Sequence, residues 1–174
     1  MDAPDNFGRT PLHITAQHGH VARIPPLNEL GADVNIRGSS GWPSVANAAK
    51  HGHVECVRVM HELGADVNTC SFRGISPVCL TAGHGEVACI RILHELGADV
   101  NLCTDKGASP VNTAALHGHV ESIRVLHELD ADVNTCNADG RSPLYVAACS
   151  GQAECIRVLH ALGADINNCD NGGL

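Results

Sequence analysis

Basic residues are scarce in this chain of 174 residues. It carries 11 Lys and Arg against 19 Asp and Glu, which gives a formal net charge of −8 at pH 7. A surplus of acidic charge opposes binding to phosphate backbones, and the sequence shows no basic stripe. We therefore predict that nucleic acid is not a partner.

Long apolar runs are also missing. No stretch approaches the roughly 20 apolar residues that a membrane-spanning helix needs. The first five residues, Met-Asp-Ala-Pro-Asp, lack the basic and apolar regions of a signal peptide. We expect no membrane partner and an intracellular protein, cytoplasmic or nuclear.

Signatures of metal binding and catalysis are absent too. Neither Cys-x-x-Cys nor His-Glu-x-x-His occurs, and no glycine-rich phosphate loop is present. The 12 histidines form ladders, but equivalent imidazoles in stacked units would lie about 10 Å apart, too far to share a zinc ion. We expect Gly52 to hold the side chains of His51 and His53 apart. The sequence predicts no metal, no cofactor and no enzymatic activity.

A repeat dominates what is present. The pentapeptide Gly31-Ala32-Asp33-Val34-Asn35 returns every 33 residues, at 64–68, 97–101, 130–134 and 163–167, with Asp130 in place of glycine and Ile166 in place of valine. Thr10-Pro11-Leu12-His13 returns in register as a Ser-Pro dipeptide followed by Val or Leu. A glycine lies between the two motifs in every unit. Such a period means that one supersecondary unit is stacked repeatedly.

This combination of motifs resembles the ankyrin repeat family. The resemblance covers residues 5–169 and divides them into repeats 5–37, 38–70, 71–103, 104–136 and 137–169. Residues 1–4 would form an N-terminal tail, and residues 170–174 would begin an incomplete sixth repeat. The resemblance implies one all-α domain, a solenoid of helix-turn-helix units with projecting β-turn or hairpin tips.

Each unit can also be interpreted physically. Thr10, Ser76, Ser109 and Ser142 are expected to cap a first helix, and the proline after each suits its first position. The central glycine ends that helix, and a second helix buries one apolar stripe. Charges four residues apart on the outer face, as in Arg58 and Glu62, are expected to pair. The other two such pairs are Arg91 with Glu95 and Arg124 with Glu128.

Two repeats depart from the pattern. Pro25-Pro26 falls inside the second helix of repeat one, where proline costs roughly 3 kcal/mol, so this helix should be frayed or reshaped. In repeat two the capping serine and the proline are exchanged, as Pro43-Ser44. The nine cysteines follow the period and, being too far apart to bridge, should be free thiols, which favours a reducing compartment.

The resemblance implies a function in binding other proteins through the tips and the concave face of the first helices. We therefore predict a monomeric scaffold or adaptor that binds a protein partner. The alternative is a structural spacer in a larger multidomain protein. Residues predicted for partner binding by their phase in the repeat are Trp42, Phe72, Arg73, Ile75, Lys106, Arg141, Lys50, His51, His84, Leu116 and His117.

The few aromatic residues sharpen this prediction. Phe7, Trp42 and Phe72 all fall on predicted tips, where packing makes little demand for size, and Tyr145 is expected to be a packing residue. Aromatic side chains commonly dominate interface energetics. The competing interpretation is that Trp42 folds back beside Pro43 to repair the altered helix start.

The resemblance also implies a possible modification. Many ankyrin repeats are substrates of an asparaginyl hydroxylase that modifies the Asn of the Asp-Val-Asn turn, with Leu eight residues earlier. The matching positions are Asn35, Asn101, Asn134 and Asn167. The alternative is that this Asn only stabilises the turn by bonding its own backbone.

Overall fold

The computed structural model describes residues 4–167, which form pairs of short antiparallel helices. The first helices of the pairs are α1 (Pro11–Gln17), α3 (Ser44–Lys50), α5 (Pro77–Ala82), α7 (Pro110–His117) and α9 (Pro143–Cys149). The second helices are α2 (Ile24–Glu29), α4 (Val54–Glu62), α6 (Val87–Glu95), α8 (Val120–Glu128) and α10 (Ala153–Ala161). The described residues contain no named strand, so the predicted all-α fold is confirmed.

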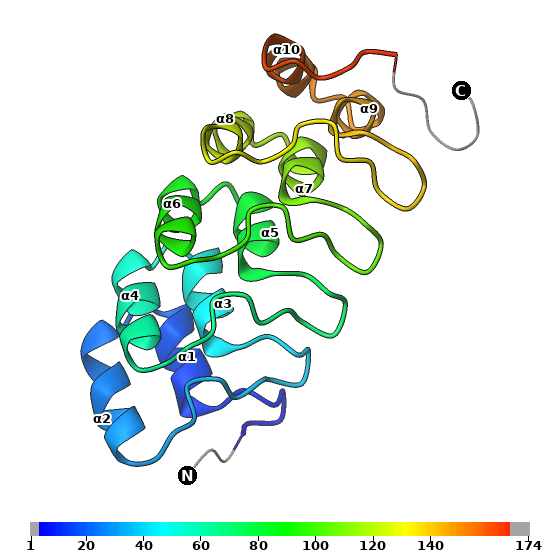
Figure 1. The fold of residues 1–174 in the computed structure, drawn as a ribbon. Coiled ribbons are helices and arrows are strands. Elements are labelled where there is room, and N and C mark those ends of the chain that lie inside the picture. The colour runs from blue at the N-terminus through cyan, green and yellow to red at the C-terminus, as the bar shows by residue number, and fades with distance from the viewer. Residues whose placement is uncertain (1–3, 168–174) are drawn as a thin grey trace.

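The helix pairs stack side by side into an elongated body (Figure 1). The first helices form an inner row and the second helices an outer row, and each helix contacts its equivalent in the next pair. The loops between pairs project beyond the inner row, away from the outer one (Figure 1). The result is the predicted solenoid.

Each projecting loop ends in a tight turn that we call a tip. The tips are residues 5–9, 38–42, 71–75, 104–108 and 137–141. In tip 71–75, Ser71 N donates to Ile75 O at 2.9 Å and Gly74 N donates back to Ser71 O at 3.1 Å. The other four tips repeat both bonds, so the predicted β-turn or hairpin tips are confirmed.

The helices start and end where local chemistry predicts. The hydroxyls of Ser76, Ser109 and Ser142 accept from the backbone N–H three residues later at 3.1, 3.1 and 3.2 Å, satisfying a donor that the helix leaves open. The Thr10 hydroxyl lies 2.8 Å from His13 Nδ1 instead. A proline follows each as the first helical residue. Gly118, which ends α7, has a φ of 78°, a value that suits glycine.

The core is a single apolar cluster between the two rows. Small residues of the inner row, Ala49, Ala82 and Ala115, are fully buried, which lets neighbouring helices approach closely. Ile90 and Ile123 of the outer row are fully buried against them. Ala148 holds the phase of Ala115 but is exposed on α9 at the end of the described stack.

Repeat one is reshaped around its prolines, as predicted. A 3₁₀ turn (Val21–Arg23) replaces the first turn of the second helix, and α2 then begins at Ile24. Pro25 and Pro26 thereby lie in the first turn of α2, where a missing N–H breaks no helical hydrogen bond. The rearrangement shortens α2 to six residues, against nine in α4.

Repeat two starts without a side-chain cap. Pro43 occupies the capping position of α3 and has no side chain that could accept a hydrogen bond. The Ser44 hydroxyl is buried and has no hydrogen-bond partner in the described structure. The exchange of serine and proline therefore weakens this helix start.

The predicted charge pairs of the outer row are wrong. Arg58 Nη2 lies 3.3 Å from Glu95 Oε2 of the next repeat, and Arg91 Nη2 lies 2.6 Å from Glu128 Oε2. Both pairs join residues 37 apart, whereas the sequence interpretation paired residues four apart in one helix. Stacking brings the next helix alongside, so each arginine reaches across the repeat boundary. The equivalent partner of Arg124 would be residue 161, which is alanine.

Candidate interaction surface

Four hollows follow one another along the tips and the inner row. The first lies between tips 38–42 and 71–75, the second between tips 71–75 and 104–108, and the third between α5 and α7. The fourth, of about 200 Å³, lies between α7 and α9 and is mostly apolar. Ile75 lines the first three, so these adjoin one another, and we call the three together the trough.

Most of the residues predicted for partner binding line these hollows. Lys50 and His51 line none of the four, although both lie at the end of α3 on the same side of the stack. The nine that do are Trp42, Phe72, Arg73, Ile75, Lys106, His84, His117, Leu116 and Arg141.

Trp42 and Phe72 line the first hollow together but differ in exposure. Phe72 is 66% exposed at its tip, whereas Trp42 is half-buried. The backbone of Trp42 is fixed, because its carbonyl accepts from Gly38 N at 3.0 Å and from His13 Nε2 at 3.0 Å. Trp42 is therefore fixed in its tip through its backbone and also lines the first hollow. That its side chain repairs the altered helix start stays a prediction.

Hydrogen bonds join three pairs of neighbouring tips. Asp105 N donates to Arg73 O at 3.3 Å, and Ala138 N donates to Lys106 O at 2.8 Å. At the other end of the stack, Ser39 Oγ donates to Phe7 O at 2.5 Å. These bonds hold neighbouring tips in register.

One position of the first helix bonds the next tip in two of the repeats. His13 donates to Trp42 O, and Asn112 Nδ2 at the same phase donates to Arg141 O at 3.3 Å. Ala46 has no polar side-chain atom at this phase, and Cys79 Sγ lies 3.1 Å from Thr113 Oγ1 instead. The tips that follow Ala46 and Cys79 border the second and third hollows.

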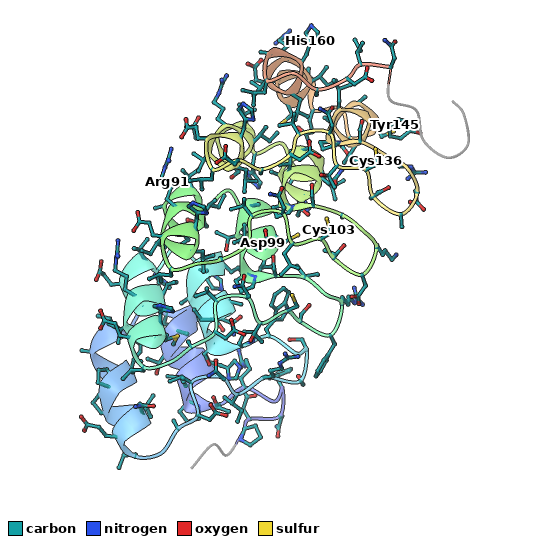
Figure 2. All side chains as sticks on the ribbon, in the orientation of Figure 1. Arg91, Asp99, Cys103, Cys136, Tyr145 and His160 are labelled. Atoms are coloured by element: carbon teal, nitrogen blue, oxygen red, sulfur yellow. The ribbon has the colours of Figure 1, made fainter. Side chains whose placement is uncertain are left out.

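Tyr145 is a candidate residue that the sequence interpretation missed. It shares the phase of His13 and Asn112, is half-buried, and lines the fourth hollow. The Arg141 guanidinium lies 5.6 Å from its ring centroid, within the range of cation–π attraction. Leu116, 47% exposed, lines the same hollow. Figure 2 shows Tyr145 at α9, near the projecting loops, and Arg91 on the outer side of α6. The phase of Tyr145 in the repeat, shared with His13 and Asn112, could have identified it from the sequence.

A family model for ankyrin repeats, spanning three copies, matches residues 1–71 and 78–170. The chain belongs to the ankyrin repeat family. No curated protein matches it. Ankyrin repeats are in general modules of protein–protein interaction, and the four hollows of this ankyrin stack lie along its tips and inner row.

The Asn ladder of the ankyrin turns joins consecutive repeats. Asn68 Nδ2 donates to Gly97 O at 3.1 Å, and its Oδ1 accepts from Asp99 N at 3.0 Å. Asn35, Asn101 and Asn134 make the same two bonds to the following repeat. The expectation that this Asn bonds its own backbone is wrong.

The turn itself is closed by the aspartate two residues earlier. Asp66 Oδ1 accepts from Asn68 N at 2.8 Å, and Asp165 Oδ1 accepts from Asn167 N at 2.9 Å. Hydroxylation at Asn35, Asn101, Asn134 and Asn167 stays a prediction. At Asn35, Asn101 and Asn134 it would act on a side chain whose amide links two repeats.

The histidines are used as structural donors. His53 Nε2 donates to Gln17 O and His119 Nε2 to Gly83 O, each at 3.1 Å, so these rings link adjacent repeats. Gly52 does not separate its neighbours as expected, because the ring centroids of His51 and His53 lie 6.3 Å apart. Burial lowers the pKa of His51, and the positive charge of Lys50 beside it acts in the same direction.

The eight cysteines among residues 4–167 are free thiols, as predicted; Cys169 lies outside the described residues. Burial raises the pKa of the Cys79 thiol to about 11 and that of Cys89 to about 12, which disfavours the reactive thiolate. Within the described range no three His, Cys, Asp or Glu side chains are grouped as metal ligands would be. None of the described helices has the length and apolarity to cross a membrane.

Proposed function

We propose that this ankyrin stack is a non-enzymatic scaffold or adaptor, monomeric and intracellular, that binds a protein partner along its tips and inner row. The observation that carries the proposal is the trough from Trp42 to His117. It is lined by residues from three consecutive repeats. A trough of this length suits a polypeptide better than a compact small molecule.

The side chains at the start of the trough suit an interface. Burying a Phe side chain contributes roughly 1.5–3 kcal/mol, and Phe72 keeps most of its surface in contact with water. Trp42, half-buried and fixed through its backbone, loses little conformational freedom on binding. Trp42 is thus a rigid anchor, and Phe72 beside it is an exposed one.

The outer row supports the same assignment by contrast. Two of its arginines pair with a glutamate of the next repeat, Arg58 with Glu95 and Arg91 with Glu128. Exposed pairs of this kind keep a face hydrated and contribute little specificity. A partner therefore gains more from the inner row and the tips.

Affinity capture from lysate tests the proposal. The wild-type protein, a Trp42→Ala/Phe72→Ala variant and a Leu30→Ala control are compared, because Leu30 is 61% exposed but lies at the end of α2, away from the tips. We expect wild type and control to retain one set of proteins that the aromatic variant loses. The affinity of the purified partner should fall at least about 30-fold, the equivalent of about 2 kcal/mol.

The capture experiment also tests the role of Trp42 and the alternative of a structural spacer. An unchanged affinity for Trp42→Ala alone would rule out Trp42 as an anchor. Capture of no partner by any of the three proteins would favour a structural spacer.

A further inference from the structure

Acidic and basic side chains are distributed unequally between the two sides of the stack. In repeats two to four, the tips and first helices (38–52, 71–85 and 104–118) carry three basic residues, Lys50, Arg73 and Lys106, and one acidic residue, Asp105. The second helices α4, α6 and α8 carry five Glu against three Arg. A protein with an acidic surplus thus presents its middle tips as a locally basic surface.

Arg73 and Lys106 form the centre of this surface. Both are exposed and both line the second hollow, together with Ile75, Thr104, Asp105 and Ala108. Neither takes part in an ion pair among the described residues. Asp105 packs against Gly74 at the base of the neighbouring tip. The two cations are therefore open to a ligand.

The backbones of the two cations are already fixed. Arg73 O accepts from Asp105 N, and Lys106 O accepts from Ala138 N, so each residue is part of the ladder that joins the tips. A ligand that contacts both residues does not have to order the loops first. Such preorganisation increases affinity and makes the spacing of the two charges selective.

Apolar side chains continue the surface on either side. Ile75 is half-buried and shared by three hollows, and Phe72 and Trp42 extend the apolar surface toward repeat two. A ligand complementary in charge therefore places carboxylates near Arg73 and Lys106. To match the apolar lining, it carries aliphatic or aromatic side chains beside those carboxylates. A phosphate backbone fits less well, because it offers no apolar group to Ile75 and Ala108 of the same hollow and the net charge of −8 opposes it.

We propose that the trough binds an extended acidic segment of the partner, with carboxylates at Arg73 and Lys106 and an apolar side chain at Ile75. This inference rests on the proposed function and names the chemistry of the partner. It differs from a general protein-binding role because it requires both cations and predicts a salt-dependent affinity.

Selection from a displayed library of random 12-residue peptides tests the proposal. The baits are the wild-type protein, an Arg73→Gln/Lys106→Gln variant and an Arg124→Gln/Arg157→Gln control, which removes the same charge from the outer row. We expect wild type and control to enrich peptides that combine Asp or Glu with Leu, Ile, Val or Phe. A synthetic copy of the best peptide should bind the tip variant at least about tenfold more weakly, with a shallower salt dependence.

Several results would overturn the proposal. These are selection of the same peptides by the tip variant, selected peptides without acidic residues, or no selected peptide at all. Binding of heparin by the wild type as tightly as the peptide would indicate a general polyanion site and would also overturn it. A captured partner that is lost by Trp42→Ala/Phe72→Ala but kept by Arg73→Gln/Lys106→Gln would leave the proposed function standing and refute the acidic segment.

Discussion

The outer and inner halves of this stack differ in how much they vary between repeats. The segments 54–68, 87–101 and 120–134 are almost the same sequence, Val-x-x-Val/Ile-Arg-Val/Ile and then Asp-Val-Asn. The inner position of His13 carries Ala46, Cys79, Asn112 and Tyr145 in the later repeats. Both halves pack one repeat on the next, and the varied half also sets the chemistry of the tips and the inner row.

The largest expected effect comes from the core that both halves share. Ile90→Ala in α6 removes a fully buried side chain and should lower the free energy of unfolding by about 2–5 kcal/mol. Urea unfolding followed by circular dichroism measures it. Leu30→Ala, at an exposed position, is the control and should change it by less than about 0.5 kcal/mol. Equal effects would mean that α6 does not pack as described.

The Asn ladder is expected to contribute next. Asn68→Ala removes two hydrogen bonds to the following repeat and should cost about 1–2 kcal/mol of unfolding free energy. Asn6→Ala is the control, since Asn6 is exposed and makes no side-chain hydrogen bond in the described structure. If the two variants unfold at the same urea concentration, the ladder does not stabilise the stack.

Asp130 tests the backbone of the constant half. It is the one non-glycine residue with positive φ among residues 4–167, at 65°, where the other repeats have glycine. Asp130→Gly should stabilise the protein by up to about 1 kcal/mol, and Gly97→Ala at φ 90° should destabilise it by about 1 kcal/mol. A Cβ on Gly97 would meet nothing within 4 Å, so this change isolates the backbone. Shifts of the same sign in thermal unfolding would contradict the argument.

The outer ion pairs should contribute little. Arg91 and Glu128 are 45% and 55% exposed in their side chains, so Arg91→Ala should cost less than about 0.5 kcal/mol. It should also leave partner capture unchanged, in contrast to Trp42→Ala/Phe72→Ala. A loss of capture on changing Arg91 would break the division between the two halves.

A pH effect at the inner row is expected to be the smallest. The pKa of His51 is lowered in the folded protein, so the unfolded chain binds this proton more readily. The destabilisation caused by protonating His51 is complete below its pKa in the folded protein. It is absent once the pH exceeds its pKa in the unfolded chain, about 6.5. His51→Gln should therefore lose less stability than wild type between pH 7.5 and pH 5.5, measured by thermal unfolding. An identical loss would show that His51 does not contribute.

Much of the local structure could be predicted from the sequence. Ser76 and Pro77 predict a helix start, and the cap is there. Pro25 and Pro26 predict a reshaped helix, because a proline nitrogen cannot donate, although the 3₁₀ turn that absorbs them was not foreseen. The tips were placed correctly by phase, and nine of the eleven residues predicted for partner binding line the four hollows.

Partners across the repeat boundary could not be predicted in the same way. Arg58 has Glu62 four residues away, and the spacing alone cannot show that it reaches Glu95 instead. Asn68 has its own turn nearby, and its amide still bonds the next one. Tyr145 was expected to be a packing residue, and only the neighbouring Arg141 and Leu116 show it lining a hollow.

The chain by itself determined the period, the helix ends and the positions of the glycine turns, because these depend on sterics and hydrogen bonds within a few residues. The tertiary structure decided which groups 29–37 residues apart meet, as in the Asn68 amide with the Gly97 carbonyl and Arg91 with Glu128. It also decided that Ala115 is buried while Ala148 is exposed, since burial depends on a neighbour in the stack. Distance between repeats is a property of the stack, which no single repeat encodes.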